Sequence, residues 1–537
     1  MEVPARVRVW RSKFAQMEAD RSVFNSHWDE IARVVAPDSA RFTSDYNTEG
    51  EKRRGELYDS IGQACNERLA AGFYSLLTSP TQKWFELNTN NPEVDNDYDV
   101  QLWLHEVSSR MFIEMGRPQC GFITAIQEVY HSLGAFGNGI IFVTESPNLS
   151  LLQFNSLPLQ ECYFGESSGN KVDTLFRKYK RTAAQLVHTF GLERLSERTQ
   201  KLYESNNISE KIDILHVIEP VQAINGKPFR TAYIELQNNH IISEGSYDEC
   251  PFAIGRFYKT SYETYGRGPG STALADLNVL QQIDKTVLQG AQKMVDPPLM
   301  VPDQGFIGAI RVAPGAISYF RQGLSAEDRI VPLQTGGVPQ LGEDLAQGRR
   351  NRIREMFYVD QLQMSEGPQM TATEVLQRAE DRMRLLGPVV GRAQAELLGP
   401  LLERVFGLML RAGRLPEPPQ ILLQPDVKLR ITYQSLMFKA QEQTEANGLL
   451  RVAQLISPFM AADPTVMDVF NTEMIARRLG QVYSLNPQFF RSQREVSEMR
   501  QQRQEQQAMQ AQLEMAAQGG AALKDTAQGM ATLGQMQ

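Results

Sequence analysis

Two groups of residues in this 537-residue chain have types and spacings that could do chemistry. The first is Gly165-Glu166-Ser167-Ser168-Gly169, which matches the GxSxG pattern and offers Ser167 as the nucleophile of a hydrolase. A nucleophile elbow needs a helix directly after the serine, but here the chain returns to a strand-like alternation. The residues therefore predict a hairpin turn, and a serine hydrolase that uses Ser167 is kept as an alternative.

The second group is a run of arginines, which stands out in an acidic chain. Guanidinium groups bind phosphates and also pair with carboxylates. Asp344 and Glu355 lie near enough along the chain to pair locally. Contact with phosphates and ion pairing, within the protein or to another subunit, are both open. The candidate basic residues are Arg349, Arg350, Arg352 and Arg354.

A glycine-rich stretch at 266–270 precedes a predicted helix, as a dinucleotide-binding loop would. Its spacing is GxGxG and no strand–helix–strand unit surrounds it, so we interpret it as a flexible hinge with Ser271 or Thr272 as the helix N-cap. The chain has no P-loop motif, no HExxH, scattered histidines and no CxxC pair. We therefore predict no catalytic residues, no metal, no cofactor and no enzymatic activity.

The charge balance limits the class of partner. There are 63 acidic and 55 basic residues, for a net charge of -8. Tight nucleic-acid binders usually carry a basic excess, because phosphate neutralisation supplies much of their affinity, so this class is disfavoured. Hydrophobic residues at 42% and charged residues at 22% are typical of soluble globular proteins. No apolar run could span a bilayer and no secretory signal is evident, so we expect synthesis in the reducing cytosol.

The elements that would position these residues predict an α+β fold with helices in the majority. Apolar residues at helical spacing predict helices at 1–36, 56–77, 98–115, 121–134 and 182–204. A short strand is expected at 83–87. From Gly139 onward the period changes to two, and strands are expected in a mostly antiparallel sheet up to about residue 258.

After residue 265 the pattern changes to long helices. Helices are predicted at 271–295 and 340–362, separated by a Gly- and Pro-rich segment with short strand pieces. A third helical pattern runs from Thr371 to about Ala412, and Gly387-Pro388 and Gly399-Pro400 predict kinks in it. Apolar residues on the first long helix step by three and four and need neighbours to bury them. The candidate packing residues are Leu277, Leu280, Val287 and Met294.

The order of these parts resembles the portal proteins of tailed bacteriophages, and most closely the head-to-tail connector of short-tailed phages, the podovirus type. The strings that carry the resemblance are IGQACNERLAAG at 61–72, PTQKWF at 80–85, GNGII at 137–141, YGRGP at 265–269 and MTATEV at 370–375. Element order and length agree over nearly the whole chain, and beyond about residue 490 the likeness is only compositional.

The resemblance implies a portal fold of wing, stem, clip and crown that assembles into a ring, typically a dodecamer. The implied parts are an α+β wing region at 1–265, a first stem helix with its Gly-rich hinge at 266–296, a clip at 297–338, a second stem helix at 339–362, a tunnel loop at 363–370, a kinked wing helix and following strand at 371–435, a helical crown at 436–490 and a partly disordered Gln/Met/Ala-rich tail at 491–537.

The tunnel loop is the most specific part of this assignment. Gly367-Pro368 breaks the helix, the stretch carries no basic residue, and Thr371 with Glu374 could cap a new helix. We expect a flexible loop that projects into the channel and touches DNA without an electrostatic clamp; an interhelical turn buried between subunits is the alternative. Its residues are Gln363, Met364, Ser365, Glu366, Gly367, Pro368 and Gln369.

The resemblance also implies a function and partners. The ring would lie in the virion at the head–tail vertex of the capsid after synthesis in the host cytoplasm. It would admit double-stranded DNA driven by a terminase, release it at ejection, and contact capsid, scaffolding and tail adaptor proteins, with no membrane partner. A coiled-coil or scaffold protein using the heptads at 273–294 is the structural alternative.

Overall fold

The computed structural model describes residues 4–39, 41–44, 50, 55, 57–95, 97–146, 151–167, 169–224, 226–300, 331–332, 339–362, 385–424, 426–433 and short stretches from 446 to 510. The chain forms two compact units: unit 1 contains residues 1–82 and 113–412, and unit 2 contains residues 83–112 and 413–537. Among the described residues more lie in helices than in strands, and the sheets are antiparallel, which confirms the predicted α+β class. The sequence did not predict that residues 83–112 group with the C-terminal part.

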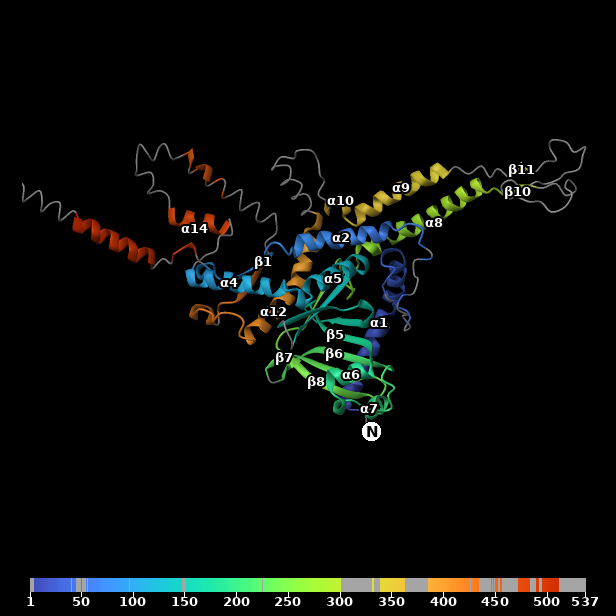
Figure 1. The fold of residues 1–537 in the computed structure, drawn as a ribbon, viewed down its shortest axis with the longest axis horizontal. Helices are drawn as coiled ribbons and strands as arrows, with labels where there is room; N and C mark the ends of the chain where they lie inside the picture. The colour runs from blue at the N-terminus through green and yellow to red at the C-terminus, as the bar shows by residue number, and fades with distance from the viewer. Residues whose placement is uncertain are drawn as a thin grey trace, which may run out of the picture. The chain divides into compact units, whose positions relative to one another are not determined.

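The larger sheet of unit 1 has five strands in chain order (Figure 1). They are β4 (Cys162–Glu166), β5 (Val172–Thr182), β6 (Lys211–Ile224), β7 (Lys227–Glu235) and β8 (His240–Tyr247). Between β4 and β5, Ser167 N donates to Lys171 O at 3.0 Å and Asn170 has φ 57°. The predicted hairpin is therefore confirmed. The nucleophile elbow is wrong, because β5 and not a helix follows Ser167.

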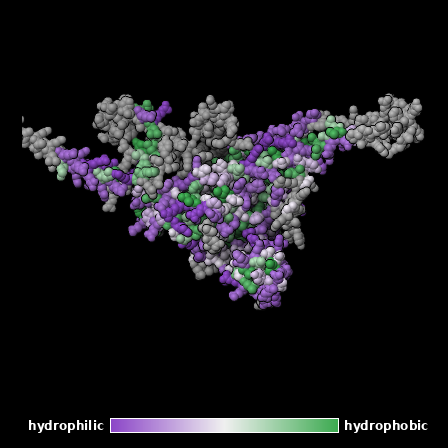
Figure 2. Space-filling model, in the orientation of Figure 1, coloured by the Kyte–Doolittle hydropathy of each residue, from purple (hydrophilic) through white to green (hydrophobic). Residues whose placement is uncertain are grey.

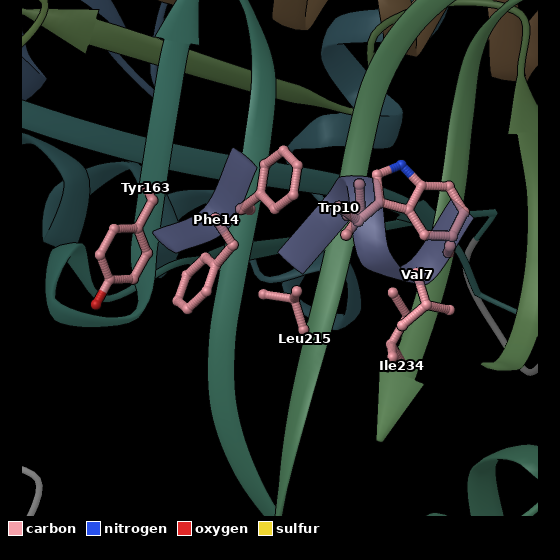
Figure 3. Close-up of a cluster of buried hydrophobic side chains, with 9 residues drawn as sticks. Val7, Trp10, Phe14, Tyr163, Leu215 and Ile234 are labelled. Carbon is pink, nitrogen blue, oxygen red and sulfur yellow. The ribbon is translucent and has the colours of Figure 1, made fainter. Parts of the chain in front are cut away.

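Helix α1 (Ala5–Val35) is the helix that the apolar spacing predicted at 1–36, and the structure packs it against this sheet. Val7, Trp10 and Phe14 are buried on one helix face (Figure 3). They pack against Tyr163 of β4, Phe176 of β5, Leu215 and Val217 of β6, and Ala232 and Ile234 of β7. The Trp10 indole N–H also donates to Glu219 at 2.8 Å, so its buried polar atom has a partner.

The helix predicted at 182–204 is two helices, α6 (Ala183–Phe190) and α7 (Glu197–Glu204). Gly191 ends α6 with φ 85°, a conformation that glycine adopts without a steric penalty. Ser196 then caps α7 by accepting a hydrogen bond from Thr199 N. The prediction of one continuous helix was wrong because the periodicity does not register a break of a few residues.

A second, smaller sheet of unit 1 has the strand order β3-β2-β9. Its strands are β2 (Asn138–Glu145), β3 (Leu152–Ser156) and β9 (Phe252–Arg256). Helices α2 (Ile61–Leu77) and α5 (Phe122–Phe136) pack closely, since a Cβ on Gly134 would lie 2.2 Å from Asn66 Oδ1. Strand β2 is buried on both faces over most of its length, as a central strand between covered layers must be.

The helical segment at 385–411 contains a π-helical turn (Gln394–Leu398) followed by α12 (Gly399–Arg411). This irregular turn lies directly before Gly399-Pro400, where the sequence predicted a kink, because Pro400 has no N–H to continue the α-helical ladder. The first part of the predicted helix, 371–384, lies outside the described residues.

Unit 2 contains a two-stranded antiparallel sheet of β1 (Phe85–Thr89) and β12 (Leu429–Tyr433). The short helix α3 (Pro92–Asp95) follows β1, α4 (Tyr98–Met115) begins in this unit, and α14 (Thr472–Val482) belongs to its C-terminal part. The strand predicted at 83–87 is present two residues later. Within the described part of the chain, no helix combines the length and apolarity needed to cross a membrane.

Candidate functional site on helices α8 and α9

Helices α8 (Pro269–Val295) and α9 (Pro339–Met356) lie side by side and extend from unit 1 (Figure 1). They correspond to the helices predicted at 271–295 and 340–362. The second is broken, because Tyr358 has φ 56° and a separate short helix α10 (Val359–Leu362) follows it. The prediction of one helix to residue 362 was therefore wrong at this point.

The inner face of the pair is an apolar seam. Leu277 and Leu280 of α8 are completely buried, as are Ala346 and Ile353 of α9. Helix α2 approaches the same face so closely that a Cβ on Gly62 would lie 2.9 Å from Leu277 Cδ2. Of the four predicted packing residues, these two leucines lie inside the subunit, Val287 is half-buried and Met294 is 60% exposed.

Ion pairs fasten α9 to its neighbours. Arg349 pairs with Asp276 of α8. Arg350 pairs with Asp284 of α8 at 3.0 Å, with Asp59 at 2.7 Å and with Glu343 at 2.8 Å. Burial lowers the pKa of Arg350, but hydrogen bonds to Asp59 and Glu343 raise it overall, so the group stays charged.

These contacts favour the ion-pairing interpretation for two of the four predicted arginines. The carboxylates in these ion pairs are not those of Asp344 and Glu355, which were expected. They belong to Glu343 and to residues distant in sequence, Asp59, Asp276 and Asp284. Arg352 is exposed and Arg354 is half-buried. Arg352 therefore keeps an accessible guanidinium on the surface of α9.

The outer face of the pair carries an apolar groove of about 500 Å³. Gly342 of α9 lies directly against Val287 of α8 in this groove, because a Cβ on Gly342 would lie 2.4 Å from Val287 Cγ2. Leu345 and Val279 line it and are 57% and 42% exposed. Figure 2 shows hydrophobic side chains interrupting the hydrophilic surface of α8 and α9. The remaining lining residues are Asn278, Gln282, Ile283 and Thr286.

A crossing of two glycine-rich segments anchors the start of α8. Gly268 is the N-cap and Pro269 the first helical residue, so the N-cap predicted at Ser271 or Thr272 was wrong. A Cβ on Gly268 would lie 2.7 Å from Gly134 O, and one on Gly137 would lie 2.4 Å from the carbonyl carbon of Arg267. The stretch interpreted as a flexible hinge is therefore a packed contact between backbones.

Asn138 locks this crossing. Its buried side-chain amide donates to Gly266 O at 3.0 Å, and its Oδ1 accepts from Gly266 N at 2.7 Å. This paired contact joins the strings at 137–141 and 265–269 in space, although 128 residues separate them. The direction of α8 is thereby set by the small sheet and α5.

Several predicted residues cannot be placed. The loop residues Gln363, Met364, Ser365, Glu366, Gly367, Pro368 and Gln369 lie outside the described residues. Of the segment 297–338, the structure describes the short pair β10 (Leu299–Met300) and β11 (Val331–Pro332), which is antiparallel. Nowhere in the described ranges do His, Cys, Asp and Glu side chains form a group that could hold a metal ion.

Comparison with known proteins now decides the family. The family model described as bacteriophage head to tail connecting protein matches residues 9–490. The chain belongs to this family. The resemblance found in the sequence is therefore confirmed, and this head-to-tail connecting protein is a structural component of a phage virion.

Two relatives of the connector are similar over nearly its whole length. One is the probable portal protein of Bordetella phage BPP-1, 29% identical over 97% of this chain and 94% of that protein. The other is the portal protein of Salmonella phage epsilon15, 28% identical over 98% of this chain and 95% of that protein. A chain in the virion of the native gene transfer agent particle is 12% identical, with 78% of this chain and 92% of that chain covered and a TM-score of 0.34.

Sequence reasoning missed the groove on the connector's outer helical face. Its signal is Gly342, a glycine inside a helix where it lowers helix stability and offers no side chain to pack. Such a glycine marks a close approach, and Leu341 and Leu345 beside it are mostly exposed. A glycine between two leucines that are mostly exposed is the sequence pattern of a surface that another helix could cover.

Proposed function

We propose that this connector is the portal subunit of a short-tailed phage and that twelve copies form a ring with a central channel. The names of the two full-length relatives support the portal assignment. The apolar outer face of α8 and α9 supports assembly, because large exposed apolar surfaces usually mark contacts with other proteins. This face carries the proposal.

In this proposal α8 and α9, within 266–296 and 339–362, are the stem. Leu277 and Leu280 hold each stem together, whereas Val279, Leu345 and the groove around Gly342 face the next subunit. Val287 lies at the boundary between the two contacts, and Met294 continues the exposed face. Neighbouring stems would bury this face as helices in bundles do.

We assign the other parts by the same reasoning. Residues 1–265 and 371–435 form the wing, 297–338 the clip, 363–370 the tunnel loop, 436–490 the crown and 491–537 the tail. The ring would stand at the capsid vertex in contact with capsid and scaffolding proteins. It would bind the terminase during packaging and tail adaptor proteins afterwards.

Double-stranded DNA is the molecule that would pass through the ring. Each subunit carries a net charge of -8, so a ring does not present a general basic surface that would hold the phosphates. Arg349 and Arg350 are neutralised by acids within the stem, which further weakens any electrostatic hold there. These features suit a conduit through which DNA slides under the force of a separate motor.

Imaging and sedimentation of purified protein test the proposal. We expect analytical ultracentrifugation and negative-stain microscopy to show a large ring with a central hole. Leu345→Asp places a charge on the proposed interface and should leave mostly monomers at concentrations where the parent forms rings. Val23→Asp, at a residue of α1 that is 78% exposed, is the matched control and should form rings.

The coiled-coil alternative has its own signature in the same measurements. A small dimer in the parent protein would indicate the coiled-coil protein. Rings formed equally well by Leu345→Asp would show that the outer face of α8 and α9 is not the subunit contact.

A further inference from the structure

The base of the α8–α9 pair contains a strained tyrosine. Tyr358 separates α9 from α10 with φ 56°, in the left-handed region that bulky side chains avoid. No glycine, asparagine or proline occurs from Arg354 to Leu362, so the local sequence does not require this break. Contacts from elsewhere in unit 1 must hold Tyr358 in this conformation.

Two consecutive residues directly after β9 make those contacts. The Tyr258 hydroxyl is hydrogen-bonded to the Tyr358 hydroxyl. The Phe257 ring stacks on the Tyr358 ring with a centroid distance of 6.4 Å and an interplanar angle of 28°. Phe257 also stacks on Phe73 of α2 at 5.7 Å, so its ring is itself held in place.

Tyr258 is rigidly attached to the start of α8. Its backbone N–H donates to Arg267 O at 3.1 Å, and Arg267 N donates to Tyr258 O at 2.7 Å. Arg267 lies two residues before Pro269, where α8 begins. A single residue therefore joins the start of one helix to the end of the other.

We propose that the α9–α10 junction is a two-state joint, which Phe257 and Tyr258 hold in its bent state. In the other state Tyr358 adopts the right-handed helical conformation, and α9 continues through residue 362 as one helix. The proposal rests on the fold of the subunit and not on ring formation.

Opposing contacts explain why the two states can be close in free energy. The bent state keeps the tyrosine pair and packs Leu362 against α2, where a Cβ on Gly72 would lie 2.9 Å from Leu362 Cδ1. The straight state removes the strain at Tyr358. It also gives the amides of Val359, Asp360 and Gln361 the i−4 carbonyl partners that the first residues of a separate helix lack. Straightening releases α10 from α2 while the glycine crossing keeps α8 in place.

Hydrogen exchange of the full-length protein tests the joint. Tyr358→Ala and Tyr358→Gly both remove the ring, but only glycine tolerates the positive φ and only alanine favours a helix. We expect the amides of residues 359–361 to exchange at least ten-fold more slowly in Tyr358→Ala than in Tyr358→Gly. Equal exchange, or faster exchange in the alanine variant, would overturn the proposal.

A milder variant tests the joint where loss of the Tyr358 aromatic ring disturbs folding. Tyr258→Phe keeps the ring and removes the hydroxyl contact, so it should slow exchange at 359–361 several-fold relative to the parent. Tyr262→Phe, in the same loop and 87% exposed, is the matched control and should exchange like the parent. Unchanged exchange at 359–361 in Tyr258→Phe would count against the joint, and imaging the same samples reports separately on ring formation.

Discussion

Buried polar residues of the connector are held by specific partners, and His216 shows what this means for acid stability. His216 lies in β6, 3% exposed, stacked on Tyr233 with a ring distance of 4.0 Å and hydrogen-bonded to Thr231 Oγ1 at 2.9 Å. Burial, together with the charge of Arg177, lowers the pKa of His216 to about 3. The imidazole is therefore neutral in the folded protein throughout the physiological range.

Acid should therefore destabilise the fold through this residue. The unfolded chain binds a proton at His216 below about pH 6.5 and the folded chain does not until about pH 3, so stability falls as the pH drops through this window. We expect His216→Gln to lose less stability than the parent between pH 6.5 and 4.5, by about 2 kcal/mol. Denaturant unfolding across that range measures it. The control variant is His240→Gln, which removes the imidazole of a half-buried histidine in β8.

Substitutions at Leu280 and Leu288, both on α8, distinguish residues that stabilise the fold from residues on the proposed assembly surface. Leu280 is completely buried inside the subunit, whereas Leu288 is 50% exposed. Leu280→Asp should lower the free energy of unfolding by about 3–5 kcal/mol, because it leaves a buried charge without a partner. Leu288→Asp should change it by less than about 0.5 kcal/mol. Chemical denaturation compares them, and similar losses in both variants would contradict the assignment of inner and outer faces.

At the scale of elements, the backbone crossing at the start of α8 is the feature most sensitive to a single methyl group. Gly137→Ala introduces a Cβ at a residue with φ 78° and against the backbone of Arg267. We expect a loss of at least about 2 kcal/mol in unfolding free energy. Gly290→Ala, in the C-terminal part of α8 where an added Cβ would meet open space, should instead stabilise the monomer by about 0.5–1 kcal/mol. Thermal unfolding distinguishes the two substitutions.

The elements that sequence reasoning found are those with strong periodicity. Helices α1 and α8 were predicted because their buried residues recur at helical spacing. The break at Tyr358 was not, since it depends on Phe257 and Tyr258 far away in the chain. The partners of Arg350 were missed for the same reason, as Asp59 lies 291 residues away. Local pattern predicts an element, whereas tertiary contacts decide where it bends and which charges meet.

At the scale of the whole molecule, the charge of the proposed tunnel loop should govern how the proposed ring holds DNA. Glu366→Lys should increase retention of DNA in filled particles and make its release more dependent on salt, because each added phosphate contact steepens the salt dependence. Glu366→Gln separates loss of repulsion from gain of attraction and should have a smaller effect. DNA release measured from 50 to 500 mM salt, about the range over which such contacts weaken, tests this.

Deletion of residues 364–369 tests whether the proposed loop acts on DNA. Rings should form normally, but packaging or retention of the genome should be impaired. Particles that fill and keep their DNA after this deletion would show that the segment only connects two helices.

The pairing of β1 with β12 also affects how the connector is made. Asn88 and Thr432, whose side chains bond at 3.0 Å, are 344 residues apart. A ribosome adding about 5–20 residues per second therefore needs about 20–70 s to deliver the second strand after the first. Over that time β1, whose alternate residues are buried in the finished fold, has an open edge that could pair with other nascent chains. The β1–β12 sheet of unit 2 can therefore form only late in synthesis, whereas unit 1 is free to fold first. The order of translation thus sets when the folded subunit is complete.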